Sequence, residues 1–241
     1  MKNIFWCKSC VVMSTRPRVT FNEKGICSAC QWAEEKKKIN WKEREKKLDK
    51  LLSDQKTNPN FQCIVPVSGG KDGSYVAYQL KHKYNMNPLT ITVRPDLALD
   101  IGNNNLSNFI SAGYNHIHIS PDPNIMRRFN KYGFIEKGFP YYGWLTAIFT
   151  SVIRAAVNYK IPLIFYGEDG EIEYGGSTKN KNTALFDVKY IKNVYLEDGY
   201  EKVLDLFDDI DKSSLYFWQL PNDEEFIEHD ISLTHWGYFE P

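Results

Sequence analysis

The sequence predicts an α/β domain with a parallel sheet, preceded by a small cysteine-bearing segment. Two observations favour this class. Short apolar runs alternate with helical patterns from residue 60 onward, and two Cys-x-x-Cys pairs precede them. Strands that alternate with helices usually form a parallel sheet that is covered on both faces. A chain of 241 residues is long enough for one such domain and a small appendage.

The elements follow from hydrophobic periodicity. Apolar runs predict strands over residues 63–67, 88–93, 116–120 and 161–167. Helical spacing predicts helices over residues 73–83, 105–113 and 142–160, and the acidic residues 196–230 are expected to be helical. In a sheet of this class, ligands bind at the carboxyl ends of the strands.

Composition divides the chain into three zones. Residues 1–31 are turn-rich, residues 32–59 predict a charged linking helix, and residues 60–241 have the α/β pattern. Lys plus Arg and Asp plus Glu are both 30, so nucleic acid is not an expected partner. Because no apolar run is long enough for a membrane span or a signal peptide, we expect a cytoplasmic protein with reduced cysteines and no membrane contact.

Four cysteines have the spacing of a zinc ribbon. They are Cys7, Cys10, Cys27 and Cys30. Two Cys-x-x-Cys pairs can hold a structural Zn²⁺ in a closed tetrahedral site. The residues between the pairs predict a hairpin with Asn22 and Gly25 at its turn. The alternatives are four unrelated buried thiols or a redox pair. Cys63 lies inside the first predicted strand and is read as a core residue.

A glycine-rich loop, "SGGKDGS", lies between the first predicted strand and the helix that follows it. Gly69 and Gly70 allow a ligand to approach the backbone closely. Free backbone N–H groups at a helix N-terminus favour an anion, and Lys71 adds a positive charge. The loop does not match the Walker A pattern. The alternative is a tight turn without a ligand.

Two other segments are expected to end at the same edge of the sheet. Val93 and Arg94, at the end of the second strand, are candidate nucleotide contacts, although Arg94 could equally be a surface residue. After the fourth strand, the acidic run that includes Glu168 and Asp169 could bind Mg²⁺ or orient a nucleophile. The alternative is a solvated acidic turn. Glu171 and Glu173 complete this run.

Two further groups of residues, a histidine pair and an aromatic run, can be explained by structural roles. His116 and His118 alternate on the third predicted strand and therefore point to one face. With no third ligand nearby, they are read as structural. The aromatic run 139–145 could line a sugar pocket, but core packing is an equal alternative.

The glycine-rich loop resembles the PP-loop of the ATP pyrophosphatase superfamily, written S-G-G-x-D-S with an optional extra glycine. In that superfamily the loop holds the β and γ phosphates of ATP as a leaving pyrophosphate, on an adenine nucleotide alpha hydrolase-like fold. The resemblance implies that the whole loop binds ATP, namely Ser68, Gly69, Gly70, Lys71, Asp72, Gly73 and Ser74. It also implies catalytic roles for Lys71 and Asp72.

The order of "CKSC", "CSAC", "PVSGGKDGS" and "GEDGEIEYGG" along nearly the whole chain resembles the N-acetyl sugar amidotransferase family of bacterial surface polysaccharide (lipopolysaccharide, O-antigen) biosynthesis. Family members convert an acetamido group of a nucleotide-activated sugar into an acetamidino group. The resemblance implies ATP, Mg²⁺ and ammonia from a partner glutaminase. The segment "SLTHWGYFEP" continues further in the family, so we expect a truncated or split member.

Two other functions fit parts of the pattern. A PP-loop tRNA thiolase would adenylate a base carbonyl and insert sulfur, but it usually has a basic face and catalytic cysteines in the nucleotide domain. A non-catalytic zinc-ribbon partner with a relict loop is the second alternative. Cleavage of ATP to AMP separates this binding protein from both enzymes.

Overall fold

The computed structural model describes residues 3–55, 58–167, 170–175, 179–196, 200–205 and 207–241. The chain forms two compact units. We call them the cysteine unit (Met1–Leu51, Gly167–Ala184 and His235–Pro241) and the sheet unit (Leu52–Tyr166 and Leu185–Thr234). In the described residues, no helix has the length and apolar character needed to cross a membrane. The boundaries predicted at residues 31 and 59 stay predictions.

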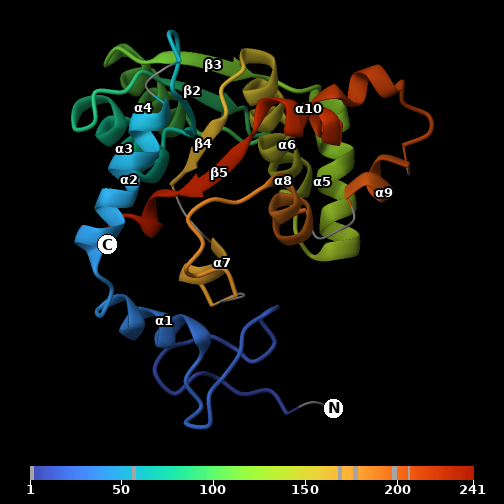
Figure 1. Cartoon of the computed structure of the whole chain (residues 1–241). Coiled ribbons are helices and arrows are strands. Elements are labelled where there is room, and N and C mark those ends of the chain that lie inside the picture. Colours follow the sequence, from blue (N-terminus) through green and yellow to red (C-terminus); the bar gives the residue numbers. More distant parts are fainter. Residues whose placement is uncertain (1–2, 56–57, 168–169, 176–178, 197–199, 206) are drawn as a thin grey trace. The chain divides into compact units, whose positions relative to one another are not determined.

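The sheet has five strands in the order β3-β2-β1-β4-β5 (Figure 1). They are β1 (Cys63–Pro66), β2 (Pro88–Val93), β3 (Asn115–Ile119), β4 (Leu163–Tyr166) and β5 (Ser232–His235). β1 pairs in parallel with β2 and β4, and β2 pairs in parallel with β3. The predicted α/β class with a parallel sheet is therefore confirmed. The sequence did not predict β5, because two polar residues and a histidine stand among its four positions.

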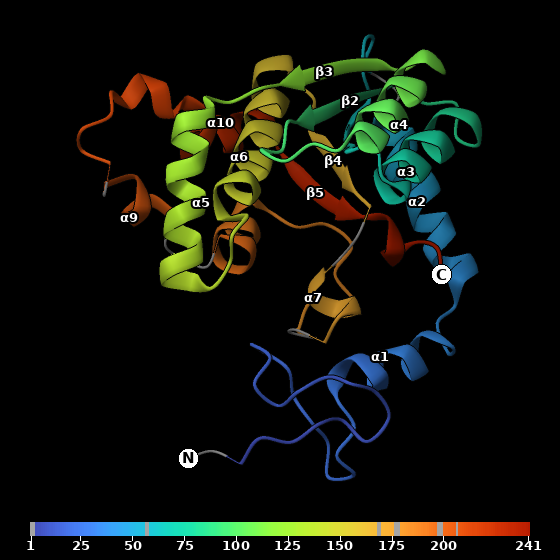
Figure 2. The same ribbon diagram turned by 180° about the vertical axis from the view of Figure 1, so that it is seen from behind.

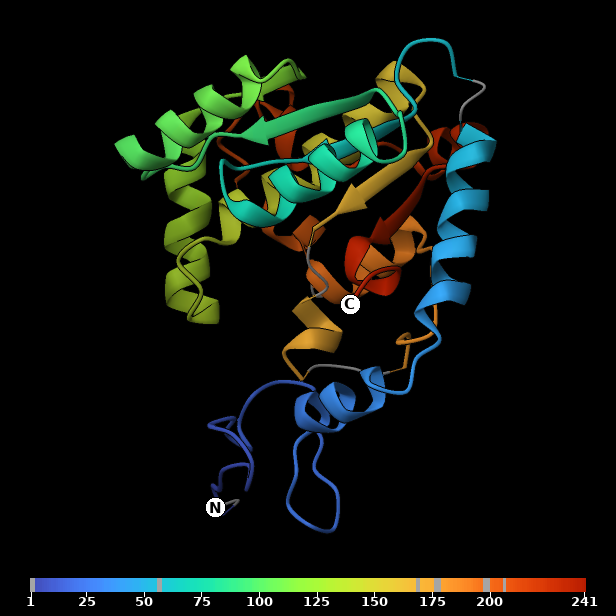
Figure 3. The ribbon, with the colours of Figure 1, turned by 90° about the vertical axis from the view of Figure 1, so that its left-hand side faces the viewer.

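Helices pack against the sheet on both faces (Figures 2 and 3). α3 (Lys71–His82) contacts β1 and β2, and α4 (Asp100–Ser111) follows β2. The apolar side chains of α6 (Tyr142–Tyr159) pack against Ile64 and Ile91 in the largest core cluster. Because side chains alternate along a strand, residues such as Val65 face the opposite side of the sheet from Ile64.

The rest of the sheet unit forms a second apolar cluster around α5 (Pro123–Lys137) and η2 (Lys212–Trp218). The rings of Phe129 and Trp218 stack with centroids 5.4 Å apart. Glycine permits the close crossing of α5 and α6, because a Cβ at Gly143 would lie 2.5 Å from the Cβ of Phe129. The remaining helices of this unit are α8 (Val188–Tyr190), η1 (Ile191–Tyr195), α9 (Tyr200–Asp205) and α10 (Asp223–His229).

Several helix predictions need correction. The helix expected over residues 105–113 already begins at Asp100, and α5 was not predicted. The charged segment is two helices, α1 (Ser28–Lys36) and α2 (Trp41–Gln55). They are separate because the side chain of Asn40 accepts a hydrogen bond from the backbone N–H of Glu43 at 3.2 Å, which starts a new helix. The described part of residues 196–230 contains the short helices α9, η2 and α10, so the helical character expected there is present.

Candidate functional site

The glycine-rich loop leaves the carboxyl end of β1 and leads directly into α3. Its entry is fixed by β2, since the Val67 N–H donates to the Ile91 carbonyl at 2.9 Å and the Thr92 hydroxyl donates to the Val67 carbonyl at 2.5 Å. At its exit, the Ser74 hydroxyl donates to the Gly70 carbonyl at 2.7 Å. The backbone of the loop is thus held at both ends by neighbouring groups.

Two of the three loop glycines are sterically required. Gly69 has φ +81°, and a Cβ there would lie 2.6 Å from the carbonyl oxygen of Gly102. A Cβ at Gly73 would lie 2.3 Å from the carbonyl oxygen of Pro66. A Cβ at Gly70 would meet only the Ser68 hydroxyl, at 3.3 Å. The loop is therefore packed tightly against β1 and α4, and is open at Gly70.

The open side of the loop is the N-terminus of α3. Gly70 is the N-cap residue and has no side chain that could cap the helix. The first N–H groups of a helix have no partner within the helix, and the helix dipole is positive at this end. Backbone donors at such a turn form a binding place for phosphate or a similar anion. The geometry predicted from the sequence is therefore present.

The two charged side chains of the loop pair with each other. Lys71 Nζ lies 2.5 Å from Asp72 Oδ1, and the Lys71 side chain is 88% exposed. A long and exposed lysine can turn toward an anion at modest cost, because exposed ion pairs contribute little. The catalytic roles expected for Lys71 and Asp72 stay predictions.

A cavity of about 230 Å³ opens at the carboxyl ends of β1, β2 and β3. Ser68 of the loop and Arg94, which follows β2, both line it. The structure thus brings together two residues that the sequence singled out separately. Its walls also include Thr92, Pro95, Leu97, Ala98, Leu99, Ile101, Gly102, Asn103, Leu106 and His118. Leu97, Leu99 and Ile101 are mostly exposed, so the cavity has an apolar rim beside a polar loop.

The structure places Val93 and Arg94 differently from each other. Val93 is buried, and its carbonyl oxygen accepts a hydrogen bond from the Trp144 indole N–H at 2.9 Å. Arg94 is exposed at the cavity, and its backbone N–H donates to the Ile119 carbonyl at 2.8 Å. A ligand can reach the Arg94 side chain directly, whereas the Val93 side chain packs in the apolar cluster around α5.

Three polar or reactive residues of the strands have distinct surroundings. His116 Nδ1 lies 2.9 Å from the Thr90 hydroxyl, and burial, with a smaller effect of His118, lowers the pKa of His116 to about 4. His118 lines the cavity. The sequence indicated only a structural role for His118 and did not predict this position. Cys63 is fully buried, and burial raises the pKa of its thiol to about 12. It is a core residue, as predicted.

The aromatic run 139–145 is divided between core and surface. Tyr142 is buried and Trp144 is half-buried, whereas Phe139 and Tyr141 are exposed. None of these four residues lines the cavity beside the loop.

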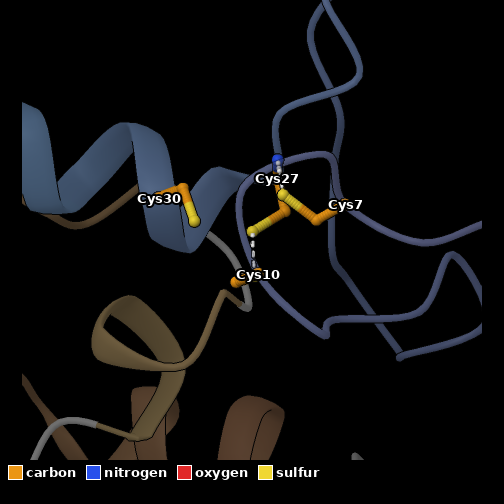
Figure 4. Close-up of side chains that lie close together, drawn as sticks. All are labelled: Cys7, Cys10, Cys27 and Cys30. Carbon is orange, nitrogen blue, oxygen red and sulfur yellow. Dashed lines mark hydrogen bonds between the residues drawn. The ribbon is translucent and has the colours of Figure 1, made fainter.

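The four predicted metal ligands come together in the cysteine unit. Each of the four sulfur atoms lies within 4.8 Å of the other three (Figure 4). Cys30 projects from α1, and Cys27 immediately precedes this helix. The predicted turn is present, because the Asn22 side chain accepts hydrogen bonds from the N–H groups of Lys24 and Ile26, both at 3.0 Å. Gly25 adopts a positive φ of 75°.

Backbone donors already favour a thiolate in this cluster. Burial alone would raise the pKa of Cys7, but the backbone N–H groups of Cys27, Ser9 and Cys10 outweigh it and lower the pKa to about 6. Burial raises the pKa of Cys30 to about 12, and it also raises that of Cys27. A cation that binds to the Cys7 thiolate would therefore displace protons from the other thiols.

Four thiolates suit Zn²⁺, which binds sulfur at about 2.3 Å in a closed tetrahedral site. The edges of such a tetrahedron are about 3.8 Å long, within the separations seen here. In the described part of the chain, this is the one cluster of three or more potential metal ligands. A redox pair is a poorer reading, because all four sulfurs converge.

Only part of the acidic segment after β4 lies within the described residues, so the role expected for it stays a prediction. Glu168 and Asp169 lie outside the described residues, as does the side chain of Glu171. α7 (Gly170–Glu173) belongs to the cysteine unit. Glu173 accepts hydrogen bonds from the Trp32 indole at 3.2 Å and from Lys36 Nζ at 2.8 Å. Its carboxylate thus anchors α7 to α1.

Further contacts fasten this segment to the helix that bears Cys30. The Ser28 hydroxyl donates to the Gly175 carbonyl at 3.0 Å, and Lys181 forms an ion pair with Glu35. A Cβ at Gly175, where φ is +87°, would lie 3.1 Å from the Cβ of Ala29. The sequence did not predict this role, because neither segment carries a local pattern that indicates contact with the other segment.

No family model matches the chain, and no curated relative matches it either. Several solved structures are similar. They include the U34-tRNA thiolase NcsA of Methanococcus maripaludis with its [4Fe-4S] cluster, at TM-score 0.39 and 16% identity over 92% of this chain and 70% of that one. The NH3-dependent NAD synthetase of Campylobacter jejuni gives TM-score 0.41 and 14% identity, over 76% and 99% of the two chains.

The NMN synthetase of Francisella tularensis gives TM-score 0.38 and 18% identity, over 79% and 82% of the two chains. All three TM-scores lie below 0.5. The chain's own geometry defines a class, an α/β protein with a glycine-rich loop between a strand and a helix and with a four-cysteine cluster.

Proposed function

We propose that this chain is an ATP-dependent amidotransferase that forms AMP and pyrophosphate. Its substrate would be a nucleotide-activated N-acetyl sugar, whose acetamido group becomes an acetamidino group. Ammonia would come from a partner glutaminase. The observation on which the proposal rests is the glycine-rich loop between β1 and α3, where the N-terminus of α3, the exposed Lys71 side chain and the adjoining cavity come together.

The loop supports cleavage of ATP at the α-phosphate. An amide carbonyl is a poor electrophile because its oxygen cannot leave. If that oxygen attacks the α-phosphate, the α–β bond breaks, pyrophosphate leaves, and an O-adenylyl imidate forms. Ammonia then adds to the imidate carbon, AMP leaves with the former amide oxygen, and an amidine remains.

The residues of the chain supply positioning and charge rather than a covalent nucleophile. The N–H groups of the loop and Lys71 would stabilise the negative charge on pyrophosphate. Ser68 and Arg94 line the same cavity, so they would contact the nucleotide, and the apolar rim suits a planar base. Mg²⁺ would enter with ATP. Glu173 would not take part in that task, since its carboxylate bonds to Lys36 and Trp32.

The cysteine cluster would hold a structural Zn²⁺ that joins the segment of Cys7 and Cys10 to the start of α1. This is a supporting role, since a closed site with four sulfur ligands leaves no position for a substrate. A tRNA thiolase is less well supported, because the one cysteine of the sheet unit, Cys63, is buried and has a raised pKa.

The experiment is an amidation assay with purified protein, ATP, Mg²⁺ and a panel of UDP-activated N-acetyl sugars. Free ammonium at high concentration should support amidine formation, and glutamine alone should not. Adding the glutaminase partner should restore the use of glutamine. Efficient glutamine hydrolysis by the isolated chain would contradict the two-protein model. Sulfur transfer to tRNA, without any amidine, would replace the proposal with the thiolase.

A further inference from the structure

The segment that follows β2 forms one side of the cavity beside the glycine-rich loop. Residues 94, 95, 97, 98 and 99 all line this cavity. Asp96 stands in the middle of the segment but does not line it. Its carboxylate instead accepts a hydrogen bond from the Asn130 side-chain N–H₂ at 2.8 Å. A residue of α5 therefore holds the wall of the cavity from the outside.

The other end of the same amide is also occupied. Asn130 Oδ1 accepts hydrogen bonds from the backbone N–H of Gly143 at 2.9 Å and of Trp144 at 3.4 Å. These are N–H groups of the first turn of α6, and no side chain at the N-cap residue Tyr141 caps that helix. Asn130 thus caps α6 from a neighbouring helix with its oxygen while it ties the cavity wall with its nitrogen.

A hydrogen bond from α6 also holds the start of the same segment. The Trp144 indole N–H donates to the Val93 carbonyl at 2.9 Å. Gly143 makes this arrangement possible, because a Cβ there would lie 2.5 Å from the Cβ of Phe129 and 3.1 Å from Asn130 Oδ1. The first turn of α6 is therefore connected to the cavity wall at two points.

We propose that Asn130 is a positioning residue for the nucleotide, acting through Asp96 on the cavity wall formed by residues 94–99. This inference rests on the proposed function, because it takes the occupant of the cavity to be the nucleoside part of ATP. An exposed six-residue segment would otherwise lose conformational freedom each time the nucleotide binds. Tying it to α5 and α6 lowers that cost in advance and keeps Arg94 and the apolar rim in place.

The two ends of the Asn130 amide allow the positioning role to be separated from helix capping. In Asn130→Asp, an oxygen still accepts from the N-terminus of α6, where a negative charge is favourable. The donor to Asp96 is lost, and two carboxylates face each other. In Asp96→Asn the link survives, because the amide oxygen at position 96 can still accept from Asn130.

The double variant Asp96→Asn/Asn130→Asp exchanges donor and acceptor. The amide at position 96 can then donate to the carboxylate at position 130, which still caps α6. Binding of α,β-methylene ATP with Mg²⁺ should be about tenfold weaker in Asn130→Asp, the scale for losing a hydrogen bond to a charged group. Affinity should return to within about twofold of the wild type in the double variant. The thermal midpoints of Asp96→Asn and of the double variant should match the wild type, and that of Asn130→Asp should fall by only about 2–4 °C for each kcal/mol lost.

A readout without nucleotide accompanies the titration. Amide hydrogen exchange of residues 94–99 should be faster in Asn130→Asp and normal in the double variant. Wild-type affinity and wild-type exchange in Asn130→Asp would overturn the inference while leaving the proposed function intact. If the wild-type protein binds no ATP analogue, the proposed function fails, and the role of Asn130 toward the nucleotide fails with it. The hydrogen-exchange data would then report only whether Asn130 holds residues 94–99 in place.

Discussion

The glycine-rich loop and the cysteine cluster are both built on tight turns, but different forces hold them. The loop lies between β1 and α3, in a unit with two large apolar clusters. The cluster lies in a segment with almost no core. Within the described residues 3–36, the buried apolar side chains are Cys7, Cys27 and Trp32, and two of these three are predicted ligands.

The difference shows which site can exist without its ligand. The loop is shaped by backbone sterics and by hydrogen bonds to β2, so it should keep its form without a nucleotide. The cysteine segment has too little buried apolar surface to stabilise itself, as is usual for small modules that need a metal. Metal binding there should be coupled to folding.

Removing the metal should have the largest effect. Structural zinc sites contribute about 10–16 kcal/mol of apparent binding free energy. Chelation, or Cys27→Ser, should therefore abolish amide protection over residues 3–36 while the protection of β1–β4 persists. Hydrogen exchange with a parallel zinc assay measures both. Cys63→Ala is the matched control and should keep about one Zn²⁺ per chain. Full metal content in a serine variant of all four ligands would rule out the site.

A change at Lys71 should be large for activity and small for stability. Lys71→Ala should lower the turnover of ATP by about 10²-fold, the scale for losing one preorganised stabiliser of charge. The thermal midpoint should hardly change, because the side chain is 88% exposed. Steady-state kinetics and thermal unfolding check the two halves. Lys47→Ala, at an exposed ion pair with Glu43, is the control. Unchanged turnover in Lys71→Ala would speak against an anion at this loop.

Substitutions at the loop glycines should test how packing of the loop contributes to stability, apart from the charge of Lys71. Gly73→Ala places a Cβ 2.3 Å from the Pro66 carbonyl oxygen, so it should lower the free energy of unfolding by about 1–3 kcal/mol, as overpacking does. Gly70→Ala, with one contact at 3.3 Å, should be nearly neutral for stability. Chemical denaturation of both variants tests this. Equal stabilities would mean that the loop yields more easily than its packing indicates.

The smallest effect is expected at the anchor of α7. Glu173→Ala removes a half-exposed ion pair and one indole hydrogen bond, together about 1 kcal/mol. Hydrogen exchange over residues 170–175 should become faster, and the magnesium dependence of turnover should stay the same. Glu34→Ala, which removes an exposed pair with Lys37, is the control. A change in magnesium dependence at Glu173 would restore it as a metal ligand.

Local patterns in the sequence predicted those parts of the molecule that local forces build. Strands β1–β4 follow from apolar runs, the loop from its glycines between strand and helix, and the metal cluster from cysteine spacing. A missed signal existed for α5, where Asp122 caps the helix and Pro123 begins it, a known start pattern. The break before α2 also had a local cause in Asn40.

Other features depend on contacts between distant segments and could not be read locally. Glu173 looks like one member of an acidic run until Trp32 and Lys36 are placed beside it. Asn130 has no sequence signal at all, because its partners come from the segment after β2 and from the start of α6. β5 has only four residues, and it forms because it can pair with β4 at the edge of the sheet.

In the proposed reaction, an amide oxygen attacks the α-phosphate of ATP while the glycine-rich loop holds the pyrophosphate. A substrate with ¹⁸O in the acetamido group tests it most directly, with mass spectrometry of the nucleotide and phosphate products. AMP should gain the ¹⁸O label, and pyrophosphate should stay unlabelled. Label in inorganic phosphate, with ADP as the main nucleotide product, would contradict it.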